Sequence, residues 1–166
     1  LRRCLRRYRP QTMSTTHEAS ERRFIRACWQ KPVDCTPVWL MRQAGRYMPE
    51  YQALKAQYSF LEICRKPEIA AKATMDAFNY LRPDAAIIFS DIMIPALAMG
   101  LELDFAPGPK LNRAIQTHDD VVSLKRPEPA KDLDFVMNAI QLTRAQLPSS
   151  ASLIGFVGAP LTLAAY

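Results

Sequence analysis

The chain has 166 residues, of which 49% are apolar, and a formal net charge of +6 at pH 7. This length is enough to bury the core of one ordinary domain. Its apolar runs have strand length and stay short of the roughly 18 consecutive apolar residues of a membrane span, which argues against a membrane protein.

The positive charge is concentrated in residues 1–12, which contain five Arg and no acidic residue, whereas the remainder has 17 basic and 16 acidic residues. A nearly neutral domain argues against a nucleic-acid-binding protein. We predict that residues 1–20 form a disordered basic tail. Residues 1–12 are either the remnant of an organellar transit peptide or sequence upstream of a start at Met13. We favour the start at Met13, and therefore a cytoplasmic protein over an organellar one.

The cysteines show no Cys-x-x-Cys pair, and His17 and His118 are the chain's two histidines. This is a poor set of ligands for a metal ion, so we expect no metal site. Reduced thiols in a reducing compartment are the expected state. The four residues concerned are Cys4, Cys28, Cys35 and Cys64.

The predicted elements begin with a short helix at residues 24–29, where apolar residues follow helical spacing. Residues 38–41 are continuously apolar and predict a first buried strand. Gly and Pro interrupt residues 42–49, which predicts a loop. A helix is predicted for residues 68–81, with Pro67 near its start.

The second half of the chain continues the alternation of strands and helices. Residues 85–89 are apolar throughout, as in strands of parallel sheets that are buried on both faces. Residues 91–100 begin as a turn, and residues 107–109 form a loop. A second long helix is predicted for residues 129–147, and a third strand for residues 152–157.

Apolar strands separated by helices predict an α/β fold with a parallel sheet, either a barrel or an open doubly wound sheet. Polar side chains follow each predicted strand: Arg42 and Arg46, then Asp91, then Tyr166. In both architectures ligands bind at that edge. A closed eight-stranded barrel takes about 250 residues. We therefore interpret the chain as a fragment, and we expect it to be inactive by itself.

Arg42 and Arg46 place two guanidinium groups four residues apart, and this planar group binds a carboxylate through two hydrogen bonds. The pair therefore suggests a polyanionic small molecule; solvated arginines, or ion pairs with Glu50 or Glu62, are the alternative. Asp91 follows an apolar strand and suits a ligand-binding acid, but from the residues alone we favour a helix cap.

Three segments together resemble the uroporphyrinogen decarboxylase family. Residues 37–51, with Arg-Gln-Ala-Gly-Arg-Tyr at 42–47, resemble its first signature. Residues 85–92 are similar to its second strand and the acid that follows, and residues 153–163 to its second signature, although Leu161 stands where the family usually has Trp. The resemblance extends from about residue 20 to residue 166 and covers slightly under half of such an enzyme.

The resemblance implies an incomplete TIM (β/α)8 barrel, in which residues 21–166 form roughly the first three strands and their helices. It implies decarboxylation of the four acetates of uroporphyrinogen III to give coproporphyrinogen III and four CO2 in porphyrin and heme biosynthesis. The implied enzyme uses no cofactor and no metal, because a protonated pyrrole is itself the electron sink. It is a homodimer when full length and binds neither nucleic acid nor membrane.

The resemblance also implies the site. Arg42 and Arg46 match the arginines that bind substrate carboxylates, and Asp91 matches the acid that faces the N–H groups of the tetrapyrrole. Tyr166 matches a substrate-binding tyrosine beside a reacting acetate. Asp91, Arg42 and Tyr166 are thus the catalytic candidates; whether Arg42 also delivers a proton stays open, because Arg is a poor acid.

Two other functions remain under consideration. A corrinoid-linked methyltransferase of the same superfamily would bind zinc through His and Cys residues in a C-terminal half. A non-catalytic anion-binding protein has the basic tail in its favour.

Overall fold

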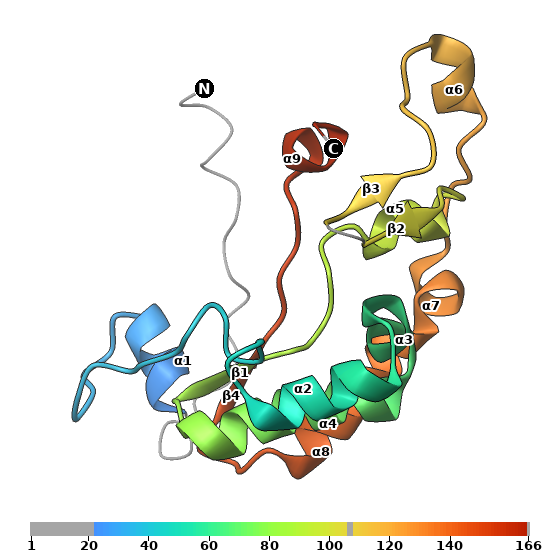
Figure 1. Ribbon diagram of the computed structural model, residues 1–166. Coiled ribbons are helices and arrows are strands. Elements are labelled where there is room, and N and C mark those ends of the chain that lie inside the picture. The colour runs from blue at the N-terminus through green and yellow to red at the C-terminus, as the bar shows by residue number, and fades with distance from the viewer. Residues whose placement is uncertain (1–21, 106–107, 166) are drawn as a thin grey trace, which may run out of the picture.

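A computed structural model describes residues 22–105 and 108–165 and confirms the α/β class (Figure 1). Its helices are α1 (Arg23–Cys28), α2 (Pro49–Gln57), α3 (Phe60–Arg65), α4 (Pro67–Leu81), α5 (Ile94–Ala98), α6 (His118–Val122), α7 (Pro129–Asp132), α8 (Asp134–Gln146) and α9 (Pro160–Ala164). Its strands are β1 (Ala85–Ile87), β2 (Leu103–Asp104), β3 (Lys110–Leu111) and β4 (Ser152–Ile154).

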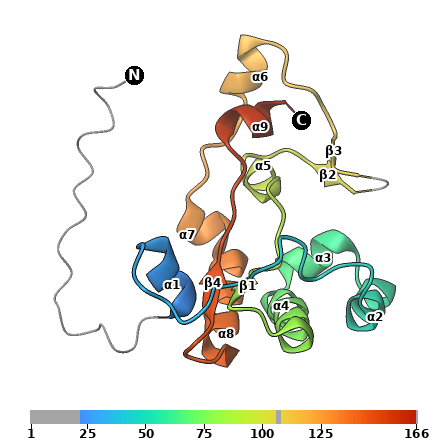
Figure 2. The ribbon, with the colours of Figure 1, turned by 90° about the vertical axis from the view of Figure 1, so that its left-hand side faces the viewer.

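The strands β1 and β4 pair in parallel, with Ala86 opposite Leu153. The long helices α4 and α8 pack against each other beside this pair (Figures 1 and 2). A separate antiparallel pair, β2 and β3, lies near α5. The predicted strands at 85–89 and 152–157 are confirmed, although the structure ends them at Ile87 and Ile154.

Helix α4 is the centre of the core. Pro67 occupies its first turn, where the missing N–H has no helical partner in any case, and Glu68 is favourable beside the helix N-terminus. The helix ends at Arg82, whose φ of 48° is left-handed. One side of α4 packs on α2 and α3 through Ala73, and the other on β1 and the end of α8 through Phe78. The helices predicted at 24–29 and 68–81 are confirmed.

The strand predicted at residues 38–41 is wrong. Residues 38–40 form no regular element, and Met41 lies in a turn and is 77% exposed. Asp84, the residue before β1, donates its backbone N–H to Val38 O at 2.8 Å, and its side-chain carboxylate accepts from the Val38 N–H. Farther along, the side chain of Gln43 binds the free edge of β1, so a strand cannot pair there. The described part of the parallel sheet therefore has two strands where three were predicted.

The single helix predicted at 129–147 is also wrong, because Leu133 (φ −126°, ψ 25°) separates α7 from α8. Helices α2, α3 and α6 were not predicted. Two of them carry a sequence signal, because Ser59 with Glu62 and Thr117 with Asp120 each form a capping box.

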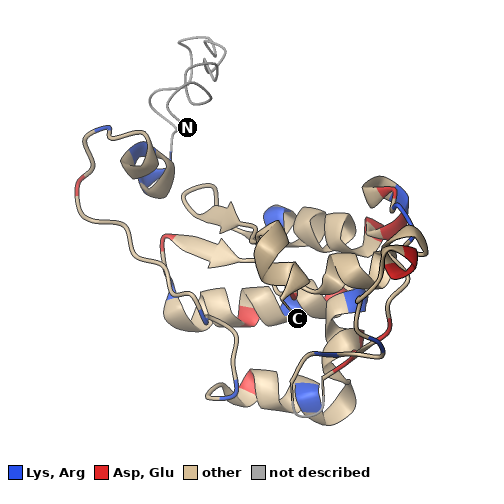
Figure 3. Ribbon diagram, turned by 90° about the horizontal axis from the view of Figure 1, so that it is seen from above, with Lys and Arg blue, Asp and Glu red and all other residues tan. Residues whose placement is uncertain are grey.

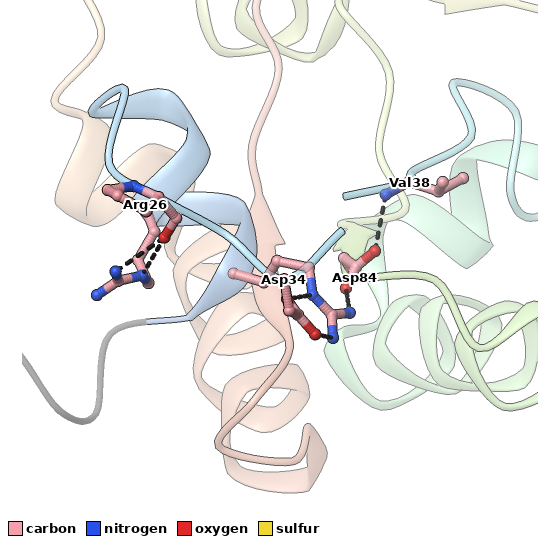
Figure 4. Close-up of polar contacts among 6 residues, drawn as sticks. Arg26, Asp34, Val38 and Asp84 are labelled. Carbon is pink, nitrogen blue, oxygen red and sulfur yellow. Dashed lines mark hydrogen bonds and ion pairs between the residues drawn. The ribbon is translucent and has the colours of Figure 1, made fainter. Parts of the chain in front are cut away.

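Hydrogen bonds hold α1 and the segment that follows it against the amino end of β1 (Figure 4). Arg23 of α1 donates to Asp34 (2.6 Å) and to Asp84 (2.6 Å). The other oxygen of Asp84 accepts from the Val38 N–H at 2.7 Å. Basic and acidic residues are interspersed over the described elements (Figure 3). Every helix in residues 22–105 and 108–165 is too short or too polar to cross a membrane.

Candidate active site

The candidate site lies at the carboxyl ends of β1 and β4. Because the two strands are parallel, the segments that leave them emerge at the same end of the sheet, one toward α5 and the other toward α9 (Figures 1 and 2). Asp91 lies in the first of these segments. The loop that carries Arg42 and Arg46 is attached to the outer edge of β1. Three of the four predicted site residues thus adjoin one strand, and Tyr166 lies outside the described residues.

Both guanidinium groups of the arginine pair are open to solvent. Arg42 and Arg46 are exposed, and neither forms an ion pair with a residue that the structure describes. Glu62, one of the alternative partners, instead closes the capping box of α3 and lies 3.6 Å from Lys66. The ion-pair alternative is therefore wrong for the described residues, and both arginines keep all their donors for a ligand.

The backbone of this loop is held firmly although its arginines are exposed. The Met48 N–H donates to Gly45 O at 3.0 Å, and the Met48 side chain is 1% exposed. Gln52 of α2 donates its side-chain N–H to Arg46 O at 2.7 Å, and the Tyr47 hydroxyl donates to Gln43 O. The loop therefore presents exposed arginine side chains from a main chain that is held by hydrogen bonds.

Asp91 is half-buried, and its two carboxylate oxygens differ. Oδ1 accepts a hydrogen bond from the Met93 N–H at 2.8 Å, in the turn before α5. Oδ2 accepts no hydrogen bond from a described residue. One oxygen thus has the capping type of contact that the sequence allowed, and the other is available to a ligand.

Thr74 was missed by the sequence analysis, although it bears on the position of Asp91. Its hydroxyl, buried on α4, accepts from the Phe89 N–H at 2.9 Å and donates to Ala70 O at 2.9 Å. One residue earlier, Ile88 N–H donates to Ile154 O of β4 at 3.0 Å. These bonds fix the chain two and three residues before Asp91. A threonine within an apolar helix stripe was the only signal of this role.

The charges of Arg46 and Asp91 each influence the pKa of a buried group. Burial, and secondly the charge of Asp91, raises the pKa of the Cys64 thiol to about 12. Burial and then Cys64 raise the pKa of Tyr51, whereas Arg46 lowers it. Tyr51 and Cys64 are both buried, and the two charges act on their pKa values in opposite directions.

Gly158 brings the exit of β4 close to the exit of β1. A Cβ atom at this position would lie 2.6 Å from Leu163 Cδ2 and 3.5 Å from Ile92 Cβ. A side chain at this position would therefore force Leu163 of α9 to shift, whereas Ile92 lies at an ordinary contact distance.

Cys28 and Cys35 are exposed and Cys64 is buried, all three as free thiols, while Cys4 lies outside the described residues. Within residues 22–105 and 108–165, no group of three or more His, Cys, Asp or Glu side chains could hold a metal ion.

A hollow of about 830 Å3 lies at the opposite end of the sheet. It is lined by α1 and by the segments before β1 and β4, including Arg23 and Asp84, which neutralise each other. Ligands of parallel α/β sheets bind at the carboxyl ends of the strands, so we do not place the site in this hollow.

Comparison with known proteins agrees with the resemblance. The family model of uroporphyrinogen decarboxylase (URO-D) matches residues 19–166. A uroporphyrinogen decarboxylase of Trichlorobacter lovleyi is 54% identical over 144 residues, and one of Geobacter sulfurreducens is 52% identical over 144 residues. Each match covers 87% of this chain but 42% of the relative, so the chain spans less than half the length of these curated proteins. The chain belongs to the uroporphyrinogen decarboxylase family.

Proposed function

We propose that the full-length protein carrying this sequence is a uroporphyrinogen decarboxylase that converts uroporphyrinogen III to coproporphyrinogen III and four CO2. The observation that supports this most directly is the set of unengaged polar groups around the exit of β1. The guanidinium groups of Arg42 and Arg46 have no ionic partner among the described residues, and Asp91 Oδ2 has no donor there. Cations and a half-buried carboxylate on two segments that adjoin one strand suit a substrate that combines carboxylates with N–H groups.

The proposed roles follow from the chemistry of the substrate. Arg42 and Arg46 hold its carboxylates, since a guanidinium remains protonated and binds a carboxylate in two places. The pyrrole is protonated at the ring carbon beside the acetate-bearing carbon. The electron pair of the breaking C–C bond then moves into this cationic ring as CO2 leaves. A proton adds to the resulting methylene carbon, and the ring loses its extra proton. Each acetate thus consumes one proton and releases one CO2, without any cofactor.

Asp91 stabilises this step electrostatically. A carboxylate fixed beside the ring N–H groups favours the positive charge that the ring carries during the loss of CO2. The bond from Met93 to Oδ1 holds the carboxylate in place while Oδ2 faces the ligand. Tyr166 completes the proposed site beside the reacting acetate, on the strength of the family resemblance.

We further propose that residues 21–166 form the first part of a TIM barrel domain, preceded by a basic tail at residues 1–20. The full-length protein is proposed to be a cytoplasmic homodimer.

The test is anaerobic incubation of the full-length protein with uroporphyrinogen III, followed by oxidation and chromatography of the porphyrins. Porphyrins with seven, six, five and four carboxylates should appear in succession. Asp91→Ala and Arg42→Ala should each lower kcat/KM by about 100-fold or more. Asp119→Asn and Arg65→Ala remove exposed charges from α6 and α3 and should leave it unchanged. A folded protein without turnover would refute the proposal, and bound zinc in it would favour the methyltransferase.

A further inference from the structure

Gln43 lies between the two arginines of the loop, and its polar side chain is buried. It is 3% exposed. Its Nε2 donates to Ala85 O at 2.6 Å, and its Oε1 accepts from the Ile87 N–H at 2.8 Å. One side-chain amide therefore satisfies a carbonyl and an N–H of β1 that lie two residues apart.

These two backbone groups are the ones that a neighbouring strand would use. The residues on either side of β1 bond to β4: Asp84 O accepts from the Ser152 N–H, and the Ile88 N–H donates to Ile154 O. Ala85 and Ile87 face the other way, because successive residues of a strand point their backbone groups to opposite sides. Gln43 occupies this outer edge as a one-residue substitute for a strand.

The same residue belongs to the loop that carries the arginines. The Cα atoms of Arg42 and Gln43 are separated by one peptide, about 3.8 Å. The carbonyl of Gln43 also accepts the hydroxyl of Tyr47, which closes the loop on itself. At the other end of this connection, Ile87 precedes Asp91 by four residues.

We propose that Gln43 is a positioning residue, which sets the guanidinium of Arg42 relative to the carboxylate of Asp91 by joining the arginine loop to β1. The inference rests on the proposed function. It singles out Arg42, because Arg46 has a second anchor in the bond from Gln52 to its carbonyl. Gln43 itself touches neither the substrate nor the reacting atoms.

The experiment uses the full-length protein with Gln43→Met, which has a similar size but no amide. We expect kcat/KM for uroporphyrinogen III to fall about 10- to 100-fold, because a displacement of about 1 Å in a site can have this effect. Gln43→Asn retains the amide on a side chain one CH2 shorter and should not restore the rate. Gln146→Met makes the same change at an exposed residue of α8 and should leave the rate unchanged.

A double-mutant cycle separates positioning from loss of stability. If Gln43 acts through Arg42, Gln43→Met should change kcat/KM by less than about threefold in an Arg42→Ala background, since coupled residues are not additive. An undiminished effect in that background would overturn the proposal. A wild-type kcat/KM for Gln43→Met in the otherwise unchanged protein would overturn it as well.

A second readout does not depend on turnover. Hydrogen exchange of the Ile87 amide should become faster in Gln43→Met, and a crystal structure of the variant should show residues 42–46 displaced from β1. An unmoved loop with a protected Ile87 amide would overturn the proposal in an active or an inactive protein. Lack of turnover by the wild-type protein would instead refute the proposed function, and the loop position would still decide the role of Gln43.

Discussion

Replacement of Thr74 by Val tests how the strand that leads to Asp91 is held. The Thr74 hydroxyl is the acceptor for the Phe89 N–H at 2.9 Å, and the side chain is 1% exposed. Valine keeps the shape of threonine and removes the hydroxyl. Ala70 O loses the hydroxyl donor but keeps the helical bond from the backbone N–H four residues later.

The expected loss therefore comes mainly from one N–H group. An unsatisfied buried donor costs about 1–3 kcal/mol. The added methyl group regains part of this, since burying a CH2 or CH3 group contributes roughly 0.8 kcal/mol. We expect Thr74→Val to lower the free energy of unfolding by about 1–2 kcal/mol. Thr74→Ser keeps the hydroxyl and should lose roughly 1 kcal/mol through the missing methyl alone.

The two variants differ at the Phe89 amide, which distinguishes the hydrogen bond from packing. Urea unfolding of the full-length protein measures the stability, and hydrogen exchange measures the protection of that amide. Thr74→Val should expose the Phe89 amide, whereas Thr74→Ser should not. The reasoning would be refuted if Thr74→Val were as stable as the wild type with its Phe89 amide still protected.

Two further predictions concern buried groups. The Ser152 hydroxyl has no hydrogen-bond partner in the described part of the chain. Ser152→Ala should therefore raise the urea midpoint or leave it unchanged, with a gain in unfolding free energy of up to about 1 kcal/mol. A lower midpoint than that of the exposed control Ser150→Ala would contradict this. Burial raises the pKa of Cys64 to about 12 from an ordinary value near 9.0, so the folded state disfavours its thiolate. The contribution of this thiol to the free energy of unfolding should be fully present below pH 9 and decline toward pH 12. Cys64→Ala should remove the decline in unfolding free energy that this thiol causes between pH 9 and 12. Iodoacetamide at pH 8 should label Cys28 and Cys35 long before Cys64, and early labelling of Cys64 would contradict its burial.

Local sequence determined much of the secondary structure. The stripe of apolar residues and the flanking prolines predicted α4 to within one residue at its start, because helix periodicity and proline geometry act over a few residues. The apolar runs predicted β1 and β4 for the same reason. The resemblance of residues 37–51, 85–92 and 153–163 identified the family, since such motifs are linear patterns.

Tertiary structure decided what those patterns could not. Residues 38–41 have the composition of a buried strand, but a strand also needs a free partner edge, and the side chain of Gln43 occupies that edge of β1. The roles of Gln43 and Thr74 likewise depend on partners 42 and 15 residues away, and no local pattern specifies those distances. The sequence by itself determined α1, α4, β1, β4 and the family of this protein. Only the fold decided which buried polar side chains hold the strand before Asp91, because hydrogen bonds between distant residues form only once the chain has packed.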